Sequence, residues 1–178
     1  MRALVRPGSP PPEGAESVIG DALDAATYAG RVAPADTFVH LVGVAHPGPG
    51  KGDAFRAIDL RSIQAAIEAI GPTVKHFVYL SVAHPAPIMR EYIAVRREGE
   101  RLVTETGLDA TLLRPWYVVG PGHGWPIVLL PVYWLAPRRL GLVTLGTMLR
   151  AMINAIENPP AGVRVLDVPA IRAAARAR

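Results

Sequence analysis

Three side chains in the middle of the chain could carry proton-transfer chemistry: Ser81, Tyr92 and Arg96. Tyr92 and Arg96 are four residues apart in an amphipathic segment, so they share one face of a predicted helix. A phenol can exchange a proton with a substrate oxygen, and a neighbouring guanidinium supplies a positive field although it cannot relay a proton. Ser81 follows an apolar strand, at the edge where open α/β sheets place their ligands.

Each of these side chains also has a purely structural interpretation. Tyr92 can be a surface tyrosine, because Arg96 is only one of several arginines on the same segment, with Arg97 and Arg101. The Ser81 hydroxyl can cap a strand end before a proline-rich loop. No metal site is predicted: the chain has no cysteine and its histidines lie apart on different strands and loops, at His40, His46, His76, His84 and His123.

Short apolar runs alternate with longer amphipathic segments along the chain. We predict strands at residues 3–5, 17–19, 37–42, 76–80, 109–113 and 163–166. We predict helices at 21–30, 53–70 and 91–106, a fourth that Thr147 caps at its N-terminus, and a last one from Ile171 onward. This alternation is typical of βαβ units on a parallel sheet. The fold class is therefore α/β, with a doubly wound, mostly parallel sheet and a small irregular C-terminal part.

The composition excludes several classes of function. The 178-residue chain has a net charge of +4, but its arginines are spread along the sequence, so no nucleic-acid surface is predicted. The apolar stretch from Trp125 to Ala136 contains two prolines and is shorter than the roughly 20 residues of a membrane span, so we expect a buried or partner-facing loop and no membrane span. No signal peptide is visible. The lack of cysteine suits the cytoplasm.

The strand ends, taken in order, resemble those of the extended and atypical short-chain dehydrogenase/reductases, the epimerase-like NAD(P)-binding branch. Each matching piece is common alone, whereas their order is specific. The pieces are residues 2–9 for the second strand and its turn, 18–21 for the third, 40–43 for the fourth, 79–81 for the fifth with its serine, 92–96 for Tyr-x-x-x-Lys, and 112–122 for the sixth strand and its Arg-Pro loop. The resemblance implies a Rossmann-like fold.

The resemblance also implies a role for each candidate site residue. Ser81 would bind the substrate carbonyl, and Arg96 would stand where the family has a lysine that lowers the pKa of the tyrosine, here Tyr92, and holds the nicotinamide ribose. A basic residue at Arg6 favours NADP over NAD, and Asp21 would bind adenine or instead cap the following helix. The remaining expected cofactor-binding residues are Gly20, Leu41, Val42, Gly43, Pro115 and Tyr117.

The sequence departs from the family at its beginning. The family starts with a strand, a Gly-x-x-Gly-x-x-Gly turn and a helix, whereas the sequence begins at the second strand. Losing the hydrogen bonds of that turn to the pyrophosphate should weaken dinucleotide binding by about 10² to 10⁵-fold. The missing strand belongs in the centre of the sheet, so we expect a natural start upstream of Met1, a remodelled relative, or a partner chain or second copy that fills the gap.

We predict a Rossmann-like NAD(P)-binding domain at residues 1–122 that lacks its first βα unit. Residues 123–178 are predicted to form a small substrate or lid region packed on it. Aromatic residues near this boundary suit an apolar substrate or an interface; they are Trp116, Tyr117, Trp125, Tyr133 and Trp134. The short length of the region leaves little room for a sugar nucleotide. Two functions stay open: an NAD(P)-dependent oxidoreductase or epimerase-like enzyme, and a non-catalytic dinucleotide sensor or assembly subunit.

Overall fold

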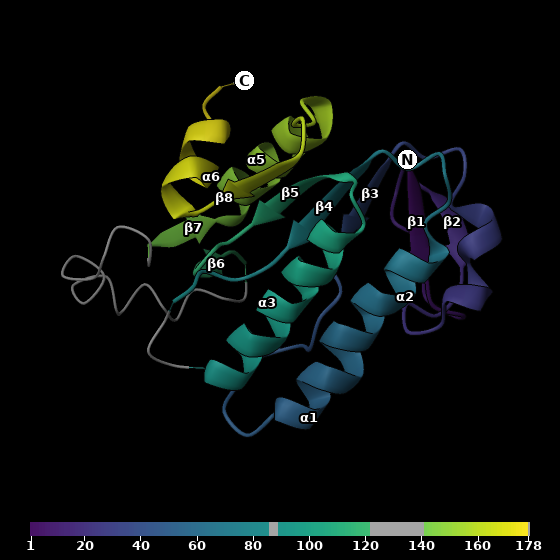
Figure 1. Cartoon of the computed structure of the whole chain (residues 1–178), viewed down its shortest axis with the longest axis horizontal. Coiled ribbons are helices and arrows are strands. Elements are labelled where there is room, and N and C mark those ends of the chain that lie inside the picture. Colours follow the sequence, from purple (N-terminus) through teal and green to yellow (C-terminus); the bar gives the residue numbers. More distant parts are fainter. Residues whose placement is uncertain (86–88, 122–140, 178) are drawn as a thin grey trace.

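A computed structural model describes residues 1–85, 89–121 and 141–177 (Figure 1). Its strands are β1 (Arg2–Val5), β2 (Glu16–Ile19), β3 (Thr37–His40), β4 (His76–Leu80), β5 (Asp109–Leu113), β6 (Tyr117–Val119), β7 (Leu142–Thr144) and β8 (Val163–Leu166). Its helices are α1 (Gly52–Ala54), a π-helical segment (Phe55–Leu60), α2 (Arg61–Ala69), α3 (Arg90–Glu105), α5 (Leu145–Glu157) and α6 (Val168–Ala174). The predicted loop at residues 125–136 lies outside the described residues.

The main sheet is parallel and has four strands in the order β3-β4-β5-β8. Successive side chains of β4 point to opposite sides of the sheet, and helices cover both sets. Val78 packs with residues of α5 and α6, whereas Phe77 and Tyr79 pack with residues of α2 and α3. Helices therefore cover both faces, as the predicted α/β class requires, and α2 and α3 lie together on one of them (Figure 1).

The expected elements are present, with differences at their ends. The predicted helix at 53–70 forms as α1, the π segment and α2 in succession. Residues 21–30 do not form an α-helix but two 3₁₀ turns, Ala25–Thr27 and Ala29–Arg31, the first capped by the Asp24 side chain. The cap of α5 is Thr144, whose Oγ1 accepts the Thr147 N–H at 3.1 Å. Asp167 caps α6, so that helix begins before Ile171.

The sheet is divided at the place where the central strand was expected to be missing. β1 and β2 pair only with each other, in parallel, and within the described residues neither is hydrogen-bonded to β3. β8, from the region predicted to be a small substrate or lid region packed on the domain, is an edge strand of the main sheet. Among the described helices, none is long and apolar enough to cross a membrane.

Candidate functional site

Helix α3 presents polar side chains at four-residue steps to the carboxyl ends of the main-sheet strands. Tyr92, Arg96 and Glu100 follow one another on this face, and Arg96 and Glu100 are buried. Apolar side chains of the same helix, among them Ile93 and Val103, anchor it on the sheet. The helix therefore holds three ionisable groups where ligands of open α/β sheets bind.

Arg96 joins the ends of β3 and β4. Its Nη2 forms an ion pair with Asp59 Oδ1 at 2.6 Å, and its Nη1 donates to the carbonyl oxygens of Leu80 at 3.0 Å and Val42 at 3.5 Å. The Arg96 side chain is 6% exposed and that of Asp59 is fully buried. The guanidinium predicted to face a cofactor is thus occupied by a carboxylate and two backbone carbonyls.

Asp59 is a site residue that the sequence prediction missed. It lies in the π-helical segment Phe55–Leu60, whose buried residues are Phe55 and Asp59, and π segments are frequent at functional sites. Its Oδ2 accepts the Val44 N–H at 2.9 Å. The signal was present in the sequence, because Asp59 lies four residues after Phe55 and four before Ile63, in the apolar stripe of the helix.

Gly43 makes the close approach of Arg96 to β3 possible. A Cβ at Gly43 would lie far inside van der Waals contact of Arg96 Nη2 and 3.1 Å from Asp59 Oδ1. The buried ion pair of Arg96 and Asp59 therefore packs directly against Gly43, which was predicted to contact the cofactor.

The Gly43→Ala variant is therefore expected to lose about 1–3 kcal/mol of unfolding free energy, the usual cost of overpacking. Urea denaturation measures this loss. Gly48→Ala is the matched control, because nothing lies within 4 Å of a Cβ there. Equal stability of the two variants would contradict the packing of Arg96 against Gly43.

Tyr92 sits half-buried between Phe55 and Arg96. Its ring centroid is 5.0 Å from that of Phe55, and the Arg96 Cζ lies 5.2 Å from the Tyr92 centroid. Burial raises the pKa of Tyr92, and the opposing effect of Arg96 is smaller. The pKa of Tyr92 is therefore raised overall, whereas the resemblance implied that the cation would lower it; the Asp59 carboxylate also opposes the effect of the cation.

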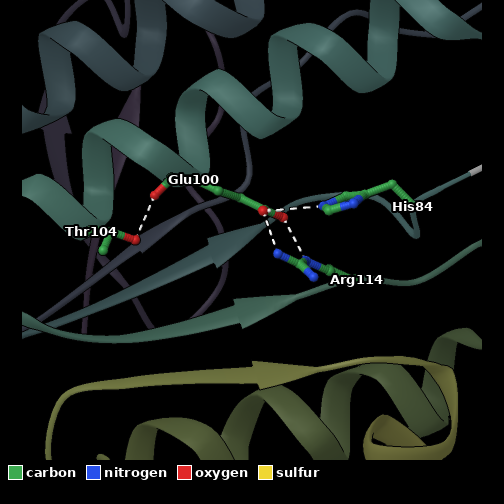
Figure 2. A network of polar contacts seen from close by, with 4 residues as sticks. All are labelled: His84, Glu100, Thr104 and Arg114. Carbon is green, nitrogen blue, oxygen red and sulfur yellow. Dashed lines mark hydrogen bonds and ion pairs between the residues drawn. The ribbon is translucent and has the colours of Figure 1, made fainter.

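A second polar cluster surrounds Glu100 (Figure 2). Arg114, after β5, donates to both carboxylate oxygens of Glu100, from Nε at 2.8 Å and from Nη2 at 2.6 Å. His84 Nε2 lies 3.2 Å from Oε2 of the same carboxylate. Burial is the largest single effect and opposes ionisation of Glu100. The hydrogen bonds from Arg114, Ser81 and His84 and the charge of Arg114 together outweigh it and hold the pKa of this carboxyl below its usual range. The cluster fixes α3 to the ends of β4 and β5.

Ser81 lies directly after β4, as predicted, and is buried. Its backbone N–H donates to the Leu113 carbonyl at 2.8 Å. Its Oγ is buried and, by hydrogen bonding, contributes to the lowered pKa of the Glu100 carboxyl. The hydroxyl therefore belongs to the polar cluster around Glu100.

The predicted cofactor residues lie at the carboxyl ends of four strands. Arg6 follows β1 and is exposed, while Leu41 and Val42 follow β3. Gly20 is buried after β2, and Asp21 Oδ1 accepts the Leu23 N–H at 2.9 Å. The alternative prediction, that Asp21 caps the following helix, is wrong: Asp24 caps the 3₁₀ helix, and the Asp21 side chain closes a turn with Leu23.

The last two predicted cofactor residues follow β5. Pro115 is buried, and its carbonyl accepts the Ala83 N–H at 2.8 Å; Tyr117 opens β6.

Two buried histidines, His40 and His76, each contact a different hydroxyl group. His40 Nε2 lies 3.2 Å from Ser62 Oγ, and His76 Nε2 lies 3.0 Å from Thr111 Oγ1. Among the described residues, no three His, Cys, Asp or Glu side chains are arranged to hold a metal ion.

Several solved structures share this arrangement of strands and helices. No protein-family model matches the sequence, and no curated protein does. The structure is similar to a nucleoside-diphosphate-sugar epimerase from Staphylococcus aureus, with a TM-score of 0.65, 17% identity, and coverage of 92% of this chain and 60% of that one. It is similar to UDP-glucuronic acid 4-epimerase from Bacillus cereus in complex with NAD, with a TM-score of 0.62, 15% identity and coverage of 85% and 60%.

A third similar structure is uronate dehydrogenase from Agrobacterium tumefaciens complexed with NAD, with a TM-score of 0.64, 18% identity and coverage of 91% and 65%. The chain thus spans between 60% and 65% of the length of these three proteins. A further match, with a TM-score of 0.63 and 15% identity, is described as a short-chain dehydrogenase/reductase superfamily protein with bound NAD. The chain therefore has the Rossmann-like α/β fold that these short-chain dehydrogenase/reductase structures share.

Proposed function

We propose that this chain is an NAD(P)-binding oxidoreductase or epimerase-like protein of the short-chain dehydrogenase/reductase kind, acting on a small apolar substrate in the cytoplasm. The observation that carries the proposal is the position of Tyr92 beside the end of β4. Arg96 contacts the Tyr92 ring, and its Nη1 donates to the carbonyl of Leu80, the residue before Ser81.

The described residues fit one end of a nicotinamide dinucleotide better than its middle. The half-buried Tyr92 suits the nicotinamide end, and the exposed Arg6 suits a 2′-phosphate. A bound NAD(P)H would supply the hydride. Arg96 is engaged by Asp59, so we assign it as a positioning residue that holds the ends of β3 and β4 beneath Tyr92.

Tyr92 fits a general acid better than a general base. Because burial raises its pKa, the phenol keeps its proton at neutral pH. It can then donate this proton from Oη to a developing oxyanion on the substrate. The arrangement favours reduction of a carbonyl over oxidation of an alcohol.

A fluorescence titration with NADPH and with NADH tests the proposal. We expect saturable binding by residues 1–178, weaker by about 10² to 10⁵-fold than binding by a chain that also carries the family's glycine turn. Arg6→Ala should weaken NADPH binding and leave NADH binding unchanged; Arg56→Ala, another exposed arginine, is the control. A folded protein that binds neither nucleotide at millimolar concentration would refute the proposal.

A second candidate is a non-catalytic dinucleotide sensor or assembly subunit. The observation that favours it is the ion pair of Arg96 with Asp59, which leaves the guanidinium no free fork for a ribose. NADPH oxidation with a panel of apolar ketones separates the two candidates. Turnover that Tyr92→Phe abolishes supports the enzyme, whereas nucleotide binding without turnover supports the sensor.

A further inference from the structure

Arg96 contacts the rings of two tyrosines. Its Cζ lies 5.2 Å from the ring centroid of Tyr92 and 5.9 Å from that of Tyr79 in β4. Tyr79 is fully buried and Tyr92 is half-buried. A cation this close to a phenol stabilises its ionised form, because opposite charges attract strongly where water is excluded. An unopposed Arg96 would therefore favour the tyrosinate form of Tyr92.

Asp59 is the counter-charge that opposes this effect. Its Oδ1 lies 2.6 Å from Arg96 Nη2, and its side chain is fully buried. Its other oxygen, Oδ2, accepts the Val44 N–H at 2.9 Å, which fixes the carboxylate in place. Burial raises the pKa of Asp59 and the charge of Arg96 opposes that rise, so the carboxylate depends on the guanidinium for its ionisation. Tyr92 therefore lies beside an ion pair and not beside a free cation.

The π-helical segment holds Asp59 in a fixed position relative to Tyr92. Phe55 and Asp59 are the two buried residues of this segment. The Phe55 ring packs on the Tyr92 ring, with 5.0 Å between their centroids, while Asp59 binds the cation that contacts the same ring. One short segment thus fixes both the phenol and the charge next to it.

Other charged groups do not take over the part of Asp59. Glu91, the residue before Tyr92, is exposed, and its carboxylate lies over Gly52 at the start of α1, 2.7 Å from the place of a Cβ there. Burial raises the pKa of Tyr92 most; of the charged groups, Arg96 lowers this pKa and Asp59 raises it. The balance at the phenol is therefore set by one cation and one carboxylate.

We propose that Asp59 is a positioning residue that sets the direction of proton transfer at Tyr92: by holding Arg96 in an ion pair, it keeps the phenol as a proton donor. This inference rests on the proposed function, the reduction of a carbonyl. The carbonyl carbon accepts a hydride from NAD(P)H and the carbonyl oxygen accepts the Tyr92 proton, which gives an alcohol, NAD(P)⁺ and a tyrosinate that regains a proton from water. Asp59 acts through Arg96.

Asp59→Asn tests the proposal in the chain without nucleotide or substrate. The variant leaves the Arg96 charge unopposed, so the pH at which the Tyr92 phenol ionises should fall by about 1 unit or more. Each unit raises the tyrosinate fraction at a given pH below the transition about tenfold. The measurement is a pH titration of the tyrosine Cζ signals by ¹³C NMR. The chain has five tyrosines, and Tyr92→Phe identifies the signal.

Glu68→Gln is the matched control. Glu68 is a carboxylate of α2 that pairs with Arg61 at the surface, so its loss should leave the Tyr92 signal unchanged. If Asp59→Asn fails to fold, the double variant Asp59→Leu/Arg96→Met replaces it. Removing both charges should leave the ionisation of Tyr92 within about half a unit of that in the unaltered chain, because the pair is nearly neutral toward the phenol.

Two outcomes would overturn the proposal. One is an unchanged ionisation of Tyr92 in folded Asp59→Asn. The other is a rise of a full unit in the double variant, which would show that Arg96 already acts as a free cation in the unaltered chain. Neither titration involves a nucleotide, so these outcomes leave the proposed NAD(P) binding standing. A chain that shows the expected shift but binds no nucleotide would refute the proposed function alone.

Discussion

Replacing Asp59 with asparagine is expected to lower the free energy of unfolding by about 3–5 kcal/mol, the usual cost of leaving a buried charge without its partner. The Arg96 guanidinium would keep its hydrogen bonds to the Leu80 and Val42 carbonyls but lose its counter-ion 2.6 Å away. Arginine cannot shed its charge to relieve the loss. Urea denaturation of the purified chain measures the difference.

Glu68→Gln is the matched control for this experiment. Glu68 pairs with Arg61 at 3.3 Å, and both side chains are exposed, so its loss should cost less than about 1 kcal/mol. The double variant Asp59→Leu/Arg96→Met should recover most of the stability, because an apolar pair of similar volume avoids the desolvation of two charges. Equal, small losses for Asp59→Asn and Glu68→Gln would show that the buried ion pair does not hold the site together.

The protein is expected to lose stability on acidification below about pH 6.5, before its carboxylates titrate. Burial and, to a smaller extent, the charge of Arg96 lower the pKa of His40 from 6.5 to about 3. The unfolded chain therefore binds a proton in this range that the folded chain does not, so unfolding is favoured as the pH falls. One histidine contributes about 1.4 kcal/mol per pH unit, or about 2 kcal/mol between pH 6.5 and 5.

His76 adds to the same effect, because burial lowers its pKa too. The measurement is the midpoint of urea denaturation at several pH values, for the unaltered chain and for His40→Gln. Glutamine keeps a polar group near Ser62 but does not titrate, so the variant should show a shallower pH dependence. Parallel pH profiles for the two proteins would contradict the assignment of His40. Glu100, with its lowered pKa, contributes only at lower pH.

Local patterns were sufficient for most of the fold. The strands at 76–80, 109–113 and 163–166 have the predicted bounds, because a short apolar run between turn residues has few alternatives in a parallel sheet. The helix ends were less certain. Thr144 and Thr147 can both cap a helix, and only the backbone geometry shows that the Thr144 side chain accepts the hydrogen bond.

The sequence by itself determined the fold class and the order of the strand ends, and it brought Tyr92 and Arg96 onto one helix face. These depend on periodicity and on contacts between near neighbours. Only the tertiary structure showed that Asp59 neutralises Arg96 and that Glu100 binds Arg114 and His84. Such contacts join residues far apart in the chain, so their partners are set by how strands and helices pack and not by local pattern.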